Sequence, residues 1–262
     1  MEQAERTALS GLRVLDLADE KAAFCSKLLA DMGAEVIKVE KPGGDASRWV
    51  GPFWRNMPHP ERSLSLWYNN TNKLGITLNL ESEEGQEIFH RLSNRSDVIV
   101  ETFPPGYLAG LGLGYEALSK TNPGLIMASV TGFGQGGPYK EYRFCDIVAS
   151  ALGGQMYVCG APETPPLKPY GQQAYYIASL FAAIGIFLAL HKRKHSGQGQ
   201  RIDISLQEAV AATLEHVMIR YFYEGVVPKR QGSFHWNGSF CLLPCKDGYI
   251  ALSPLIWMGY PS

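Results

Sequence analysis

Short apolar runs alternate with helix-like segments along the first part of the chain. Residues 12–17 and 34–40 have the length and apolar content of strands, and the segment 22–32 between them repeats apolar residues every three or four positions. Gly33 follows that segment, at the place where a helix typically ends. A connection of this length allows the two strands to run in the same direction, so a parallel βαβ unit is predicted.

The same alternation occurs twice more. Strand-like runs at 76–80, 97–101 and 125–130 are separated by helix-like segments at 83–93 and 115–120. Repeated alternation of this kind is typical of α/β proteins. We therefore predict an α/β fold with a Rossmann-like open parallel sheet.

The composition changes towards the C-terminus. A helix predicted over 206–224 is followed by turn-forming residues and by a predicted hairpin at 241–251 around an Asp-Gly pair. We predict a large Rossmann-like domain at 1–224 and the start of a second, smaller α+β domain at 225–262, which we interpret as incomplete.

Residues 174–190 are apolar almost throughout and precede a basic cluster. The segment is slightly shorter than the roughly 20 residues that span a bilayer. No other segment supports a membrane protein, so we interpret it as a core helix that is buried on all sides.

Charge argues against a large electrostatic partner. The formal net charge is -1, and lysines and arginines are scattered along the chain. Neither nucleic acid nor a membrane surface is therefore an expected partner.

The cysteines indicate a reducing compartment. Their number, 5, is odd, and the first ten residues do not form a secretory signal. We expect a cytoplasmic protein. Cys241, Cys245 and nearby His235 lack the second ligand pair of a structural zinc site, so no metal is expected.

The first βαβ unit does not have the features of a dinucleotide site. Such a site needs a glycine-rich turn after its first strand, and residues 18–22 contain two carboxylates and no glycine. We therefore expect neither a nicotinamide nor a flavin. The glycine-rich segment 131–138 follows another strand. It could bind an anion through free amides or serve as a flexible connection, and both interpretations stay open.

Four groups of residues together resemble the class III CoA-transferases, the family of formyl-CoA and carnitine CoA-transferases and of α-methylacyl-CoA racemase. They are residues 13–17 with 28–40, residues 97–103 with Pro105-Gly106, residues 129–138, and residues 196–203. The resemblance holds from about residue 10 to 253. It implies coenzyme A as a substrate, a large and a small domain, and two chains interlocked like links. Because family members are longer, we expect this chain to be truncated or naturally short.

The resemblance also locates a missing nucleophile. In the family an aspartate attacks the acyl-CoA and forms an anhydride, then an aspartyl-CoA thioester. Matching the family's Asp-Tyr-Phe-Ser-Gly to residues 175–179 places Tyr175 at the aspartate. A phenol has a pKa near 10, so it is mostly un-ionised at neutral pH. No Asp or Glu occurs between Thr164 and Lys192. The racemase His-Asp pair is Cys145-Asp146 here, which disfavours proton abstraction next to the thioester.

The resemblance implies a set of CoA contacts, which are Lys21, Lys41, Leu78, Thr102, Phe103 and Arg143. Lys41 stands where the family usually has Arg, and Glu81 stands where some members have Lys. Lysine keeps the charge but loses the bidentate fork of arginine, and glutamate reverses the charge. We expect weaker CoA binding than in a standard member.

These observations favour a chain that transfers CoA between an acyl-CoA and a carboxylic acid as the non-nucleophilic subunit of a heteromeric transferase. Benzylsuccinate-type CoA-transferases of aromatic degradation are an example, and the expected partner is a second chain that bears the aspartate. Two alternatives stay open: an autonomous CoA-transferase with an atypical nucleophile, and a non-catalytic acyl-CoA-binding or regulatory protein. Tyr170, Tyr175, Tyr176 and Trp54 fit either an aromatic acyl pocket or an ordinary core.

Overall fold

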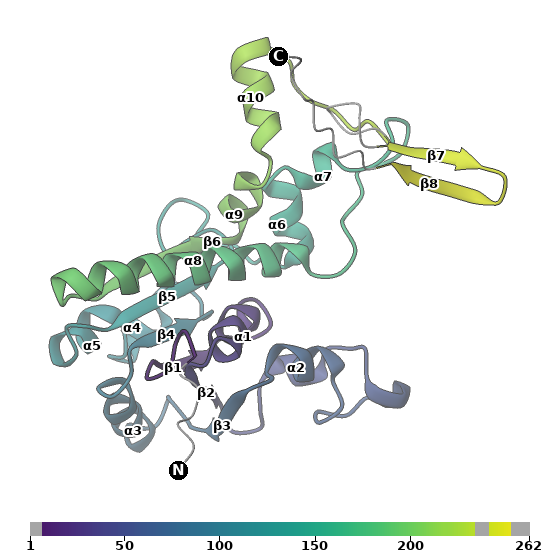
Figure 1. Cartoon of the computed structure of the whole chain (residues 1–262). Helices are drawn as coiled ribbons and strands as arrows, with labels where there is room; N and C mark the ends of the chain where they lie inside the picture. The colour runs from purple at the N-terminus through teal and green to yellow at the C-terminus, as the bar shows by residue number, and fades with distance from the viewer. Residues whose placement is uncertain (1–6, 234–240, 253–262) are drawn as a thin grey trace.

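The computed structural model describes residues 7–233 and 241–252. Its centre is a 6-stranded sheet with the order β3-β2-β1-β4-β5-β6, in which every neighbouring pair is parallel (Figure 1). The strands are β1 (Arg13–Leu17), β2 (Glu35–Glu40), β3 (Lys73–Thr77), β4 (Val98–Glu101), β5 (Ile126–Thr131) and β6 (Gln200–Ser205). The predicted α/β fold with an open parallel sheet is therefore confirmed.

Helices pack on both faces of this sheet. One face carries α1 (Ala23–Asp31), α6 (Asp146–Leu152), α8 (Gln173–Ser196) and α9 (Leu206–Ala212); the other carries α3 (Glu83–Ser93), α4 (Tyr107–Gly110) and α5 (Tyr115–Thr121). Successive strand residues point to opposite faces, so Val14 joins the core beneath α1 and α8 while Leu15 joins the core beneath α3 and α5. This double covering explains why the strands are apolar on both sides.

The remaining elements lie outside this layered core. They are η1 (Ala46–Trp49), η2 (Trp54–Asn56), α2 (Leu64–Asn69), α7 (Gln155–Val158), α10 (Glu215–Glu224), β7 (Cys241–Cys245) and β8 (Gly248–Leu252). The last two form the predicted antiparallel hairpin. In Figure 1, α10 and this hairpin extend away from the sheet. The division into domains near residue 225 stays a prediction.

The first βαβ unit forms as the apolar pattern predicts. α1 ends at Asp31, and Gly33 adopts a φ of +96°, a left-handed conformation that only glycine adopts at little cost. The chain can then reverse directly into β2, whose register with β1 runs from Arg13–Glu35 to Asp16–Lys38.

The third strand lies earlier than the apolar run at 76–80 predicts. β3 pairs with β2 from Val36–Lys73 to Glu40–Thr77. Lys73 is therefore the first residue of the strand, and Leu78 lies just after its last residue. The cause is a buried partner for the Lys73 ammonium. A search for apolar runs misses the start of a strand when a charged residue lies there.

The helix predicted over 206–224 is interrupted. α9 ends at Ala212 and α10 begins at Glu215. At the break, the Thr213 hydroxyl donates a 2.7 Å hydrogen bond to the Val210 carbonyl, and the Leu214 amide donates to Ala211 at 3.0 Å. Side-chain bonding of this kind competes with the regular helical ladder and allows the axis to change direction.

The long helix α8 is a core helix on one side only. It packs against α1, α6, α9, β5 and β6, and Ala178, Ala182 and Ile186 are fully buried. On its opposite side, Ile184 and Leu188 are 53% and 65% exposed. The prediction of burial on all sides was therefore wrong for this chain. By length and composition alone, α8 would also be long and apolar enough to cross a membrane.

A buried cluster of charges joins the first three strands. Asp16 of β1 accepts hydrogen bonds from Lys73 Nζ of β3 at 2.8 Å and from Ser26 Oγ of α1 at 2.7 Å. Lys73 Nζ also donates to the Ala23 carbonyl at 2.9 Å. Both ionic side chains are almost completely buried, at 1% and 0% exposure. Although burial opposes ionisation, Lys73 and Lys38 hold the pKa of Asp16 below its usual value.

We predict that Lys73→Met lowers the free energy of unfolding by about 3–5 kcal/mol, because it leaves the Asp16 carboxylate buried without its partner. Chemical denaturation measures this change. The double variant Asp16→Asn/Lys73→Met should recover part of the loss, since no unpaired charge then remains.

Arg13→Gln is the matched control. Arg13 and Glu35 form an ion pair of 2.5 Å between β1 and β2, but both side chains are exposed. That variant should cost less than about 1 kcal/mol. Equal losses in Arg13→Gln and Lys73→Met would contradict the role given to the buried pair.

Candidate functional site

The topology places a crevice at the carboxyl edge of the sheet. β1 lies between β2 and β4, so the chain moves outward from β1 in one direction and from β4 in the other. Loops that leave such a switch point diverge and open a crevice, which is where ligands bind in open α/β sheets. A pocket of about 530 Å³ occupies this place, next to Leu17, Glu40 and Thr102 at the ends of β1, β2 and β4.

Most of the residues that the family resemblance proposed for CoA binding meet in this pocket. The residues of that set that line it are Lys21, Lys41, Leu78, Thr102 and Phe103. They come from loops after four different strands, so only the fold brings them together. Arg143 does not line the pocket and is exposed. Their role in binding CoA stays a prediction.

Two of these loops are fixed to each other. The Thr102 hydroxyl accepts a hydrogen bond from the Asp19 amide at 3.0 Å and donates one to Asp19 Oδ1 at 3.0 Å. Asp19 in turn forms an ion pair with Lys21 and accepts from the Lys21 amide at 3.0 Å. The loop after β1 therefore takes its shape from the end of β4, and it presents Lys21 at the pocket.

The loop after β2 is fixed by carboxylates. Glu40 accepts hydrogen bonds from the Asp45 amide at 2.9 Å and from two Arg48 nitrogens at 2.6 and 2.8 Å. Burial raises the pKa of Glu40, but these bonds outweigh it and leave the pKa below its usual value. Buried Lys38 reaches the same loop through Asp45 at 3.3 Å, and it also donates to the Ala18 carbonyl.

The pocket lining includes two lysines, two aromatic rings and the carboxylates of Asp19, Glu40, Asp45 and Glu81. Lys41 is exposed and forms no ion pair with any residue in 7–233 or 241–252, so its ammonium is available to an anion. The rings of Phe103 and Tyr107 stack 4.7 Å apart. Glu81 opposes anion binding, since its carboxylate accepts from the Tyr107 hydroxyl at 3.1 Å and adds negative charge. The arrangement suits a ligand with phosphates and a planar base, such as CoA, with Glu81 lowering the affinity.

Tyr175 lies outside this pocket, in the first turn of α8. Its side chain is buried, with 6% exposure. The turn is capped by Asp146 of α6, whose Oδ1 accepts from the Ala174 amide at 2.9 Å and whose Oδ2 lies 2.8 Å from Lys168 Nζ. A carboxylate at this place is favoured by the positive end of the helix.

A second carboxylate approaches the same turn from the loop after β1. Glu20 Oε2 accepts from Gln172 Nε2 at 3.3 Å, immediately before α8 begins. Burial raises the pKa of Glu20. Burial also raises the pKa of Tyr175, and the charges of Glu20 and Asp146 raise it further. Tyr175 is therefore a neutral phenol at physiological pH, unsuited to act as an anionic nucleophile.

Sequence reasoning named Asp146 only as the second member of the pair Cys145-Asp146, and it placed neither Asp146 nor Glu20 near Tyr175. It searched between Thr164 and Lys192, whereas Glu20 lies about 150 positions earlier and Asp146 belongs to another helix. Only the packing of α1, α6 and α8 around one core brings them together. No local sequence pattern would have indicated that Glu20 and Asp146 lie near Tyr175.

The glycine-rich segment has a partner within the chain. The Gln135 amide donates to both oxygens of Asp203, at 3.1 and 2.9 Å, and Gly134 adopts a φ of +81° beside that carboxylate. This amide is therefore not free for an external anion, whereas anion binding by the other amides of the segment stays open. The loop is instead anchored to β6.

The structure identifies no group of three or more metal-ligating side chains within residues 7–233 and 241–252. Cys241 and Cys245 are free thiols. His235, which the sequence placed beside them, lies outside the described residues.

Comparison with known proteins shows which family this chain is similar to. Residues 9–256 match the profile of CoA-transferase family III. The chain is 42% identical over 243 residues to a subunit of succinyl-CoA:(R)-benzylsuccinate CoA-transferase from Thauera aromatica, covering 93% of this chain and 59% of the relative. It is 41% identical over 253 residues to the beta subunit of succinyl-CoA–L-malate CoA-transferase from Chloroflexus aurantiacus, covering 94% and 61%. The chain thus spans about three-fifths of these relatives.

Solved structures agree with the sequence comparison. A CaiB/BaiF family protein from Brucella suis superposes with a TM-score of 0.86 at 38% identity, covering 94% of this chain and 65% of that one. A protein from Mycobacterium tuberculosis superposes with a TM-score of 0.75 at 29% identity, covering 83% and 60%.

We predict that Glu81→Lys raises the affinity of the chain for CoA about three- to tenfold, because it removes a negative charge from the pocket and adds a positive one. Isothermal titration calorimetry measures the effect, which should shrink as ionic strength rises.

The control is Glu87→Lys, which makes the same change of net charge at an exposed position of α3 outside the pocket. It should leave CoA affinity unchanged. A similar gain in both variants, or none in Glu81→Lys, would mean that CoA does not use this pocket.

Proposed function

The chain belongs to CoA-transferase family III, and we propose that it takes part in CoA transfer as the non-nucleophilic subunit of a heteromeric transferase. One observation carries the proposal. The chain has a pocket at the carboxyl edge of its sheet, while the residue that the resemblance aligns with the family's aspartate is Tyr175, a buried neutral phenol. A chain that keeps its binding scaffold and lacks its nucleophile fits a role beside a partner that supplies one.

In the proposed reaction, a carboxylate of the partner chain attacks the acyl carbonyl of an acyl-CoA and releases the CoA thiolate, leaving a mixed anhydride. The thiolate attacks the enzyme carbonyl of that anhydride, frees the first acid and leaves an enzyme–CoA thioester. The acceptor acid repeats the two steps in reverse order and leaves as the new acyl-CoA. This chain would hold CoA through Lys21, Lys41 and the wall at Phe103.

The names of the relatives support a substrate class. Among them are transferases of succinyl-CoA with (R)-benzylsuccinate, L-malate and D-citramalate, all of which are dicarboxylic acids. We propose a dicarboxylic acid as acceptor. An aromatic cluster next to Tyr175 supports a bulky or aromatic acyl group: the Phe24 ring stacks 6.3 Å from Tyr68 and meets Tyr176 edge-on at 5.0 Å. A place in aromatic degradation is consistent with this cluster.

Partner and compartment also belong to the proposal. Two relatives are the alpha and beta subunits of one kind of transferase, which supports a heteromer with an Asp-bearing chain of the same family. An interlocked arrangement of the two chains would follow from the family. Five free cysteines support a reducing, cytoplasmic location.

One observation favours a second candidate, an autonomous transferase with an atypical nucleophile. Glu20 places a carboxylate against the first turn of α8, beside the position that the family's aspartate would occupy. A glutamate could perform the same covalent steps. This candidate predicts CoA transfer by the chain alone and its loss in Glu20→Gln.

Co-expression tests the first candidate. The chain, together with an Asp-bearing member of the family from the same cells, should form a complex that transfers CoA from succinyl-CoA to a dicarboxylic acid, while neither chain alone does so efficiently. In the complex, Glu20→Gln should keep most of the activity. No complex, or no gain in activity on mixing, would contradict the proposal.

A further prediction concerns the missing carboxylate. Tyr175→Asp should give the chain alone measurable exchange of CoA between acyl-CoA and free acid, detected with isotope-labelled acid. Because Glu20 and Asp146 lie near, they should raise the pKa of the new carboxyl, so the exchange rate should increase with pH.

Tyr175→Asn is the matched control, since asparagine has the same size as aspartate and no charge. It should show no exchange. If both variants fold, as circular dichroism would show, and the aspartate variant remains silent while CoA still binds, then the lost nucleophile is not the only defect.

A further inference from the structure

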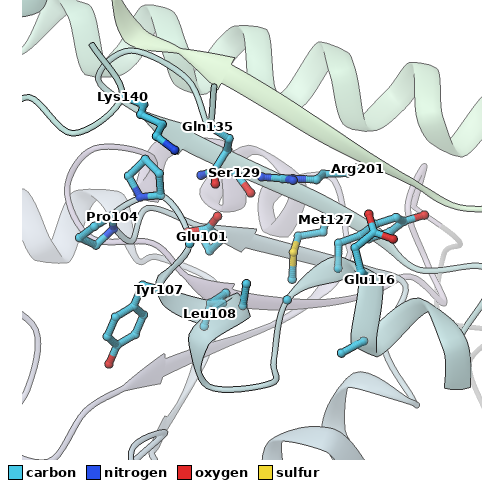
Figure 2. Close-up of a pocket in the computed structure, with 16 residues that line it drawn as sticks. Glu101, Pro104, Tyr107, Leu108, Glu116, Met127, Ser129, Gln135, Lys140 and Arg201 are labelled. Carbon is cyan, nitrogen blue, oxygen red and sulfur yellow. The ribbon is translucent and has the colours of Figure 1, made fainter. Parts of the chain in front are cut away.

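A second pocket, of about 350 Å³, lies beside the first at the ends of β4 and β5. The segment 104–107 separates the two, and Pro104 and Tyr107 line both. Figure 2 shows the second pocket, with β6 contributing Arg201 and the glycine-rich loop contributing Gln135. The function proposed above gives this pocket no role.

Its walls are of two kinds. Lys140 and Arg201 extend from opposite sides towards Gln135 and Ser129 (Figure 2). Apolar residues such as Leu108 and Met127 line another part, and the carboxyl groups of Glu101 and Glu116 also belong to the lining. Such a combination suits a ligand with an anionic head and a short apolar body, because a guanidinium and an ammonium can share a carboxylate that water would otherwise solvate.

A buried carboxyl group lies between these walls. Glu101, at the end of β4, is 5% exposed, and its Oε2 accepts from the Phe103 amide at 2.8 Å. Burial raises the pKa of Glu101 to about 7, although hydrogen bonds from Ser129 and Phe103 and the charge of Arg201 act in the opposite direction.

The other charged groups around Glu101 define its setting. Arg201 and Asp203 come from β6, Lys140 comes from the glycine-rich loop, and Glu116 comes from α5. Asp203 raises the pKa of Glu101, but its oxygens are already held by the Gln135 amide. Lys140 also forms an ion pair of 3.8 Å with Glu141, and both of these side chains are exposed. The cavity therefore has Arg201 and Lys140 beside a carboxyl group that can carry a proton.

We propose that this pocket binds a small carboxylate with a short apolar body, whose anionic head lies between Arg201 and Lys140, next to the carboxyl group of Glu101. Leu108 and Met127 cover its body. The site is independent of the proposed CoA transfer, because it lies on the other side of segment 104–107 and needs neither CoA nor a partner chain.

The pH dependence of binding follows from Glu101. Below about pH 7 Glu101 carries a proton and donates a hydrogen bond to the ligand, whereas above that pH two carboxylates would repel each other in the pocket. Since a simple carboxylic acid is itself ionised above about pH 5, binding is tightest between these values and weakens as pH rises towards 8.

Calorimetric titration of the chain with butyrate tests the proposal. Butyrate should bind at pH 6 at least threefold more tightly than at pH 8. Acetate should bind less tightly by about fourfold for each CH₂ group of butyrate that the pocket buries. n-Butylamine, which has a similar body and the opposite charge, should not bind.

Variants assign the effect to the pocket. Arg201→Gln should weaken butyrate binding about tenfold at both pH values, since a charge-assisted bond is lost. Glu101→Gln should abolish the pH dependence, because an amide donates at every pH. Arg91→Gln, at an exposed arginine of α3 outside the pocket, should change neither.

The results that would overturn the proposal are equally specific. They are butyrate affinity that is the same at pH 6 and 8, affinity that survives Arg201→Gln, or binding of butylamine as tight as that of butyrate. Saturating CoA should leave butyrate affinity within about twofold, and competition between the two would place butyrate in the first pocket instead.

Discussion

The buried charges of Asp16, Lys73 and Lys38 fix the edge of the sheet on which the sites depend. Asp16 lies in β1, Lys73 in β3 and Lys38 in β2 between them, and all three are almost inaccessible to water. Charges can remain in such a place only when every one is paired and hydrogen-bonded. Lys38 extends the cluster to Asp45, a residue that lines the pocket at the carboxyl edge of the sheet. The buried charge cluster is thereby connected directly to a residue that shapes the pocket.

The same scaffold separates binding from covalent chemistry. The pocket is formed by loops that follow the parallel strands. The sheet holds these loops in place independently of the residues of α8. Tyr175 lies in a different element and takes no part in the Thr102–Asp19 hydrogen bond that joins two of the pocket's loops. A change at position 175 can therefore leave the pocket's loops in place. That independence is what makes division of labour between two related chains physically reasonable.

Local pattern predicted the elements whose residues alternate cleanly. The strand ending at Leu17, the helix at Glu83–Ser93 and the parallel arrangement all followed from periodicity and connection length. It failed where a tertiary contact decided the outcome: Lys73 belongs to β3 because Asp16 provides it with a buried partner. It also failed for the surroundings of Tyr175, because Glu20 reaches that helix only through packing. Resemblance to a family named five residues that meet in one pocket, whereas composition and spacing alone did not.

The central claim is that this chain binds CoA but does not carry the covalent intermediate. The most direct test is to mix the chain and its Asp-bearing partner with succinyl-CoA, stop turnover with hydroxylamine, and locate the resulting hydroxamate by peptide mass spectrometry. The account predicts a hydroxamate on a carboxylate of the partner and none on this chain. A hydroxamate on Glu20, or on any other residue of this chain, would contradict it.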